Sequence, residues 1–296
     1  MVPRLLLLAA VLVPLWVGQA AETNPWSDAS NLLIEDAHRG FTEALETKKG
    51  SLRENHFGMA ITLLGKQPKT RGNIDESARI LDELTSENAD DDLGIASQYY
   101  RARIEEAHRF EPDLAKATAG YEALSEKYPQ HWFGQMAVVR RAFIILYEGN
   151  GSDKEGRLAS AERLEPLLIA NPAARDFHLL LGLAYLRFKL YPDRALRHFL
   201  AADAAAVPRW GSRGNVYIRI AELARSLGQK DLAIDYYKRF IKDFARDQRI
   251  YLVQERLAEL EAAPKIGTPV TAPAPAVTEA TPAPVTPETA PTPVSP

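Results

Sequence analysis

The sequence predicts an all-α fold, a right-handed α-solenoid of about twelve helices arranged in antiparallel pairs. Between Glu22 and Ala263, apolar residues recur every three or four positions, which is the period of an amphipathic helix. Glycine, proline and asparagine interrupt this pattern about every 15 to 20 residues, and the alternation typical of strands is rare. Residues 21–263 of the 296-residue chain are therefore predicted to form one helical domain.

Helix boundaries follow from the apolar period and from residues that favour helix ends. Asp75 and Asp113 lie where an acidic side chain interacts favourably with a helix N-terminus. The residues before Pro129 and Pro172 end helices, because a residue that precedes proline avoids the helical conformation. The predicted helices are 28–47, 51–65, 74–87, 91–108, 112–127, 131–148, 153–170, 174–189, 193–206, 212–227, 230–244 and 248–261.

The first 20 residues have the pattern of a secretory signal peptide. Arg4 precedes an apolar run from Leu5 to Val17, and small residues follow at Gly18 and Ala20. An uncleaved membrane anchor is the alternative, but a spanning helix needs about 20 apolar residues and this run is shorter. We expect cleavage after Ala20 and an exported protein, periplasmic or secreted.

Residues 264–296 have the composition of a disordered tail. This segment contains 10 of the 20 prolines of the chain, and its only charged residues are Lys265, Glu279 and Glu288. Proline removes backbone donors and favours extended geometry, and the segment has too few large apolar residues to form a core. We expect a spacer or a passive solubilising tail; a glycosylated stalk and a ligand for a groove are alternatives.

The overall composition excludes several classes of site. The chain has no cysteine, which rules out disulfides, cysteine–zinc sites, thiol catalysis and attachment of lipid through cysteine. Its formal net charge of −3 gives no support for a nucleic-acid-binding surface. An exported domain of about 240 residues can bury enough apolar surface to fold without disulfides.

The helices repeat in pairs that share a pattern of small and large residues. Leu181, Gly182 and Tyr185 in one helix are followed by Ala195 and Phe199 in the next. The same pattern returns as Ile220, Ala221, Ala224, Ala233 and Tyr237. Small residues allow two helices to approach closely while large ones fill the adjacent space. Tyr185, Phe199, Tyr217, Tyr237 and Phe240 are predicted to be core residues at helical spacing.

This pattern resembles the tetratricopeptide repeat (TPR) over roughly residues 74–245, most plainly in the last two repeats. The alanines that begin the second-helix pattern are 39, 44, 34 and 38 residues apart, whereas the period of the family is 34. Residues 233–244 resemble second helices of exported cell-envelope members, which act in outer-membrane assembly and peptidoglycan coordination. The resemblance implies a stacked solenoid that binds proteins or peptides.

The motifs of common enzymes and cofactor sites are absent from the sequence. It has no phosphate-binding loop and no nucleophile elbow, and no two of its six histidines have His-x-x-x-His spacing. We therefore expect no cofactor, metal ion or catalytic activity, although metal ligands from distant segments can still meet in space. The acidic run 90–92 is predicted to be a helix start rather than a cation site.

The resemblance implies that the first helix of each pair lines a concave groove. The residues that this register places in the groove are Asp176, Leu183, Arg187, Asn215, Glu222 and Arg225. This mixture of charged, amide and apolar side chains suits an extended peptide. Trp210 lies in a predicted loop, either as an exposed binding anchor or as a plug between repeats.

Two functions follow from these observations. The first is a non-catalytic, exported scaffold that binds a protein or peptide segment of a cell-envelope complex. The alternative is a helical enzyme or accessory domain that acts on a cell-wall polymer, which requires acidic and aromatic residues in the groove. The segment 248–261 is predicted to cap the solenoid with Arg249 and Arg256 outward and Tyr251 and Leu252 inward, which favours a monomer.

Overall fold

The computed structural model describes residues 24–148, 152–169, 171–207 and 210–262. Every regular element in these ranges is a helix, which confirms the predicted all-α fold. The predicted signal peptide and the proline-rich tail lie outside the described residues. Within the described ranges, no helix has the length and apolar character needed to cross a membrane.

Thirteen α-helices occupy the described residues. They are α1 (Pro25–Ser30), α2 (Ile34–Glu46), α3 (Leu52–Gly65), α4 (Arg71–Glu87), α5 (Asp92–Arg103), α6 (Leu114–Lys127), α7 (Trp132–Phe143), α8 (Lys154–Glu162), α9 (Asn171–Phe188), α10 (Pro192–Ala204), α11 (Trp210–Ser226), α12 (Lys230–Asp243) and α13 (Ile250–Ala262). Two π-helical turns, η1 (Ile104–His108) and η2 (Ile144–Glu148), extend α5 and α7. A 3-10 turn, η3 (Glu165–Leu167), follows α8.

Helix starts are set by short polar side chains. Asp91 accepts a hydrogen bond from the Gly94 N–H at 2.8 Å, which confirms the acidic run 90–92 as a helix start. Asp113 accepts a hydrogen bond from the Lys116 N–H at 2.9 Å and begins α6 in the same way. The helix predicted from 74 begins earlier, at Arg71, so Asp75 lies in its second turn.

Two predicted helices are broken in the structure. The segment 28–47 forms two helices, because Leu32 has a φ of 62° in the left-handed region and ends the first one. The segment 153–170 is helical only to Glu162 and continues in the 3-10 turn η3, where Pro166 has no N–H to donate. The first break accounts for thirteen α-helices where about twelve were expected.

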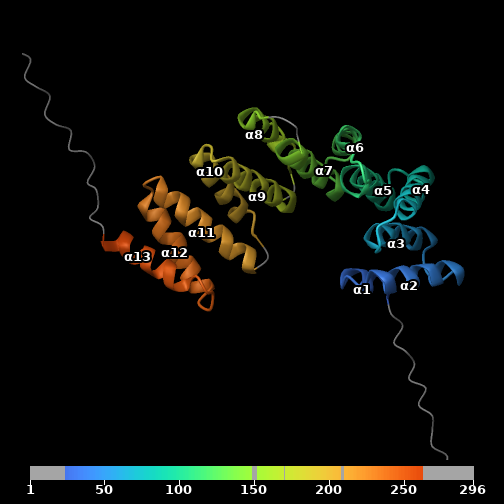
Figure 1. Cartoon of the computed structure of the whole chain (residues 1–296), viewed down its shortest axis with the longest axis horizontal. Helices are drawn as coiled ribbons and strands as arrows, with labels where there is room; N and C mark the ends of the chain where they lie inside the picture. Colours follow the sequence, from blue (N-terminus) through green and yellow to red (C-terminus); the bar gives the residue numbers. More distant parts are fainter. Residues whose placement is uncertain (1–23, 149–151, 170, 208–209, 263–296) are drawn as a thin grey trace, which may run out of the picture.

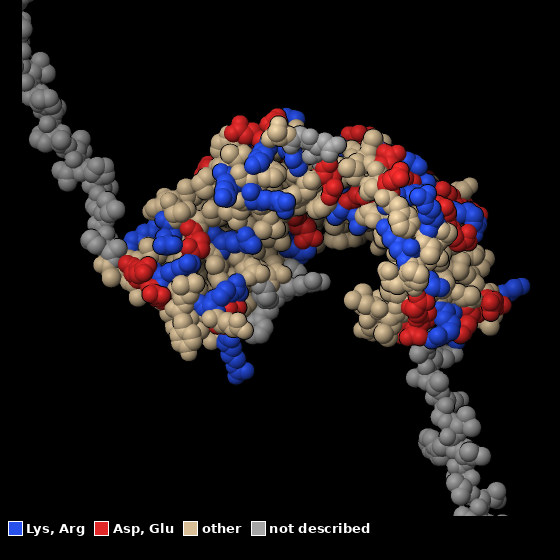
Figure 2. All heavy atoms as spheres, in the orientation of Figure 1, with Lys and Arg blue, Asp and Glu red and all other residues tan. Residues whose placement is uncertain are grey.

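The helices follow one another along an arch (Figure 1). Consecutive helices pack against each other, and α3 also contacts α5, α5 contacts α7, and α7 contacts α9. In Figure 1, α6, α8 and α10 lie on the outer side of the arch, with α5, α7 and α9 on the inner side. Figure 2 shows that the arch encloses a hollow between its two ends, with charged side chains of both signs inside.

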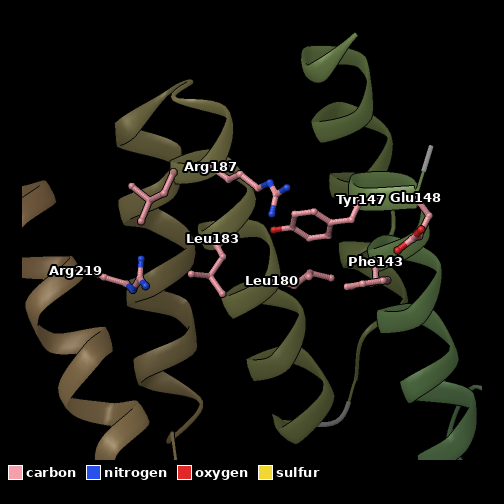
Figure 3. Close-up of a pocket in the computed structure, with 8 residues that line it drawn as sticks. Phe143, Tyr147, Glu148, Leu180, Leu183, Arg187 and Arg219 are labelled. Carbon is pink, nitrogen blue, oxygen red and sulfur yellow. The ribbon is translucent and has the colours of Figure 1, made fainter. Parts of the chain in front are cut away.

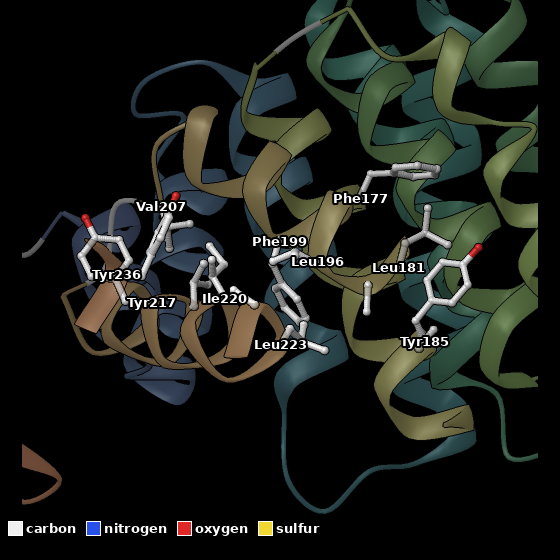
Figure 4. Close-up of a cluster of buried hydrophobic side chains, with 14 of the residues drawn as sticks. Phe177, Leu181, Tyr185, Leu196, Phe199, Val207, Tyr217, Ile220, Leu223 and Tyr236 are labelled. Atoms are coloured by element: carbon white, nitrogen blue, oxygen red, sulfur yellow. The ribbon is translucent and has the colours of Figure 1, made fainter. Parts of the chain in front are cut away.

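Buried side chains form three apolar clusters along the arch. A large cluster joins residues from α7 to α13, and Figure 4 shows part of it. Two smaller clusters fill the N-terminal half. The predicted core aromatics Tyr185, Phe199, Tyr217, Tyr237 and Phe240 are all buried. The five second-helix alanines are also buried, namely Ala78, Ala117, Ala161, Ala195 and Ala233.

Two consecutive units match residue for residue at an offset of 40. Gly94 and Gly134 occupy the same place, because a Cβ on either one would lie 1.9 Å from the carbonyl oxygen six residues earlier, of Asn88 or Tyr128. Both helices also end in a π-helical turn. The 40-residue offset, rather than the 34-residue period of the family, explains why these first helices do not fit that pattern.

The last helix differs from the expected cap. Val253 is buried in α13, whereas Tyr251 is 81% exposed and Leu252 is also exposed. Arg256, expected on the outer face, instead points to α11 and pairs with Glu222. The inward face of α13 is therefore rotated relative to the prediction.

Candidate functional site

A pocket of about 840 Å³ lies where three inner helices meet. It is open and mostly apolar, and Figure 3 shows side chains that reach into it from the end of α7, from α9 and from α11. A concave, largely apolar surface with a few polar groups is the usual form of a binding site. The residues that line it are Phe143, Tyr147, Glu148, Leu180, Leu183, Leu186, Arg187 and Arg219.

Two guanidinium groups border this pocket without a carboxylate partner. The Arg187 guanidinium lies over the Tyr147 ring, 5.6 Å from its centroid, and that of Arg219 lies 5.8 Å from the centroid of Phe199. Neither forms an ion pair with a described carboxylate. Both charges are therefore held by aromatic faces and remain able to bind an acidic group.

Glu148 is the one carboxylate in the described lining of the pocket. Hydrolysis of a glycan requires two carboxyl groups on opposite sides of the bond that breaks. The pocket lining therefore does not supply the acid–base pair that the alternative enzyme hypothesis requires.

The structure brings two of the predicted groove residues together in this pocket. Leu183 and Arg187 both line it, and Leu183 is 39% exposed. Asp176 lies two turns earlier on α9, where its carboxylate pairs with Arg175 at 2.8 Å. Four apolar or aromatic contributors were missed, namely Phe143, Tyr147, Leu180 and Leu186, although Phe143 and Tyr147 are four residues apart and Leu180, Leu183 and Leu186 three apart.

The remaining predicted groove residues lie elsewhere. Asn215 accepts a hydrogen bond from the Arg249 Nη1 at 2.7 Å, and Arg225 pairs with Glu222 at 3.1 Å. These three α11 residues lie toward α12 and α13, not in the pocket, whereas Arg219 of the same helix lines it. Trp210 is the first residue of α11, and its side chain lies outside the described residues.

A buried charged cluster ties α5, α6 and α7 together. The Glu106 carboxylate accepts hydrogen bonds from the Tyr121 hydroxyl and the Arg103 Nη1, both at 2.6 Å, and from Arg140. Only 3% of the Glu106 side chain is exposed. Burial raises the pKa of Tyr121, so its hydroxyl stays protonated and able to donate.

The same three residue types recur at the C-terminal end with the same spacing. Glu222 on α11 accepts hydrogen bonds from the Tyr237 hydroxyl on α12 and from Arg256 on α13. The tyrosine follows the glutamate by 15 residues and the arginine follows it by 34 in both clusters. We call them the Glu106 cluster and the Glu222 cluster.

The middle junction, of α9, α10 and α11, lacks this arrangement. The turn after α9 matches the turn after α11, with Lys189 and Gly228 both at positive φ and the same backbone hydrogen bonds around them. By this match, Leu183 stands where the Glu222 cluster has its glutamate. In the second helix, the correspondence of Ala195 with Ala233 places Phe199 where that cluster has its tyrosine. An arginine, Arg219, still reaches this junction, and the pocket lies beside it.

Comparisons with known proteins give similarities to repeat proteins. No protein-family model and no curated protein sequence matches the chain. Among solved structures, the chain is similar to a thermophilic TPR protein of Thermus thermophilus, with 19% identity, a TM-score of 0.39, and coverage of 71% of this chain and 98% of that chain. It is also similar to a tetratricopeptide repeat protein from Parabacteroides merdae, with 14% identity, a TM-score of 0.33, and coverage of 80% and 96%.

Proposed function

We propose that the protein is a non-catalytic scaffold that binds a segment of another protein in the pocket between α7, α9 and α11. The segment carries a carboxylate next to an apolar side chain. The observation that supports this proposal is the missing glutamate of the middle junction, where Arg219 and Arg187 border an apolar pocket with no paired carboxylate among the described residues.

The chemistry of the pocket suits such a segment. A carboxylate from the ligand can form a bidentate pair with a guanidinium, in place of the glutamate that the two clusters supply from within the chain. An apolar side chain beside it covers Leu180, Leu183 and Phe143 and removes their surface from water. A short segment held by these two interactions binds with a Kd of the order of micromolar.

We further propose that the protein is exported and acts in a cell envelope. The support is the signal-peptide pattern of residues 1–20 and the proline-rich segment 264–296, which has the composition of a spacer. Mass spectrometry of the protein recovered from the exported fraction of the native cells should find a new N-terminus at Ala21. Retention of residues 1–20 in a membrane fraction would contradict export in soluble form.

Binding is tested by selecting peptides from a random library with the full chain. Enriched peptides should share an acidic residue or a free C-terminus next to leucine or an aromatic residue. Arg219→Ala should weaken the binding of a selected peptide at least about tenfold, the loss expected for a charge-assisted pair. Raising the salt concentration should weaken it in the same direction.

Arg225→Ala is the matched control, because it removes an arginine of the same helix that lies outside the pocket. It should leave the affinity within about twofold of the original. If Arg225→Ala weakens binding and Arg219→Ala does not, the ligand occupies the groove register predicted from the sequence and the pocket is not the site. Selected peptides without any carboxylate preference would also contradict the proposal.

A further inference from the structure

A second group of side chains with metal-binding chemistry lies away from the pocket, where α8, α9 and α10 meet. Glu165 comes from η3, His178 from α9 and His198 from α10. One ligand atom from each residue lies within 4.8 Å of the other two. The Nδ1 atoms of the two imidazoles are 2.9 Å apart, and His198 has no exposed surface.

This group is held in place by neighbours that a metal site needs. The Nε2 of His198 lies 3.2 Å from the Glu162 carboxylate, on the opposite side of the ring from the Nδ1 that faces His178. A carboxylate in this position accepts a hydrogen bond from an Nε2–H, the tautomer that leaves the Nδ1 lone pair for a cation. In that tautomer the Arg197 Nη2 beside the ring donates to the Glu162 carboxylate, at 3.0 Å, and not to Nε2. The Tyr185 ring stacks on the His198 imidazole, with 5.7 Å between the ring centroids, and this contact fixes the plane of the imidazole.

We propose that Glu165, His178 and His198 form a binding site for a divalent first-row transition metal ion, of which Zn²⁺ fits best. Two imidazole nitrogens and one carboxylate oxygen are a donor set that zinc accepts, with a fourth position left for water. In a tetrahedral site two nitrogen ligands lie about 3.3 Å apart, so the imidazoles need to separate by only about 0.4 Å.

One charged neighbour must share Glu165 with the ion. Arg197 lies 3.2 Å and 3.3 Å from the two carboxylate oxygens of Glu165, and its Nη2 lies 2.9 Å from the His198 Nε2. A carboxylate has enough lone pairs to bind an ion through one oxygen and the guanidinium through the other. The ion joins η3 to α9 and α10, because its three ligands come from these three elements. This inference does not depend on the proposed peptide binding.

The experiment treats the full chain with a chelator, removes the chelator, and titrates it with Zn²⁺ and Co²⁺ separately. One equivalent of Zn²⁺ should bind and raise the melting temperature, and Co²⁺ should give the strong visible absorption of a tetrahedral site. His178→Gln and Glu165→Gln should each weaken Zn²⁺ binding at least about tenfold. Glu162→Gln, which neutralises the carboxylate that faces the His198 Nε2 and pairs with Arg194 and Arg197, should weaken it by about 10–100-fold.

His131→Gln is the matched control, because His131 lies at the start of α7 and contacts Asp92 rather than this group. It should leave the stoichiometry and affinity for Zn²⁺ unchanged. Helical circular dichroism shows whether each variant is folded, and His178 and Glu165 are tested separately so that one unfolded variant does not decide the result. Less than one equivalent of bound Zn²⁺, or equal affinity in both folded variants, overturns the proposal.

Discussion

The Glu106 cluster and the Glu222 cluster have the same residues at the same spacing in different surroundings. Glu106 is 3% exposed and binds two arginines and a tyrosine, whereas Glu222 is 27% exposed. A charge inside the protein depends fully on its partners, while one near the surface is also stabilised by water. The comparison teaches that the contribution of a repeated contact to stability is set by its burial, not by its geometry.

Neutralising each glutamate should give the largest difference between the two clusters in the loss of unfolding free energy. Glu106→Gln removes a buried carboxylate from Arg140 and Arg103, whose side chains are 23% and 24% exposed, and it should lower the free energy of unfolding by about 3 kcal/mol. Glu222→Gln should lower it by about 1 kcal/mol. Urea unfolding followed by circular dichroism measures both. Equal losses would show that burial does not decide the difference.

Removing the tyrosine hydroxyls should give a smaller difference in the same direction. Tyr121→Phe removes a hydrogen bond of 2.6 Å to a buried carboxylate and should cost about 1.5–3 kcal/mol. Tyr237→Phe removes the equivalent bond to a carboxylate that water also reaches, and should cost about 1 kcal/mol. The same unfolding measurement tests both variants, and a larger loss for Tyr237→Phe would contradict the comparison.

Acid should destabilise the protein in part through His108 in the N-terminal half. Burial lowers the pKa of His108 to about 4, assisted by the charges of Arg103 and Lys69. The folded state therefore keeps His108 neutral while the unfolded chain takes up a proton below pH 6.5. Its contribution to stability is complete above pH 6.5 and is lost as the pH falls toward 4, by about 1–2 kcal/mol.

The measurement is the free energy of unfolding of the original chain and of His108→Gln at several values between pH 7 and pH 4. The variant should show a shallower decrease, since glutamine does not titrate. Burial also lowers the pKa of His38, His178 and His198, so much of the slope should remain in the variant. A parallel decrease in both chains would rule out His108 as a source of the pH dependence.

Adding the missing glutamate to the junction of α9, α10 and α11 should have the smallest effect on stability and the largest effect on peptide binding. Leu183→Glu places a carboxylate where the other two junctions have one, within reach of Arg219 across a solvent-exposed pocket. The new pair should change stability by less than about 1 kcal/mol. It should abolish peptide binding, because Arg219 then has an internal partner. Leu183→Gln is the control without charge, and equal peptide binding by both variants would contradict the role of Arg219.

The fold was largely predictable because apolar residues at three- and four-residue spacing identify both the helices and the face of each helix that is buried. Tyr185, Phe199 and Tyr237 were predicted to be buried from their spacing alone, and they are. The break at Leu32 was not predictable, because leucine rarely adopts a positive φ.

The site was less predictable because one helix offers several polar residues and the sequence does not state which neighbour each one faces. Glu222 and Arg219 are three residues apart on α11, yet one binds α12 and α13 while the other borders the pocket. Their direction depends on the angle between successive helix pairs, which local spacing does not determine. The recurrence of Glu, Tyr and Arg at intervals of 15 and 34 was the available signal for the two clusters.

The succession of helix pairs along the arch has a mechanical consequence. Helix pairs pack mainly against their neighbours in sequence, and the two ends of the arch stand apart across the hollow (Figure 2). The distance between the two ends of the arch is therefore set by the sum of the small angles between successive helix pairs. Bending at the middle of a curved rod changes the distance between its ends more than bending near either end. The pocket between α7, α9 and α11 lies near the middle of the arch, beside the joints whose angles have the largest effect on the distance between its ends.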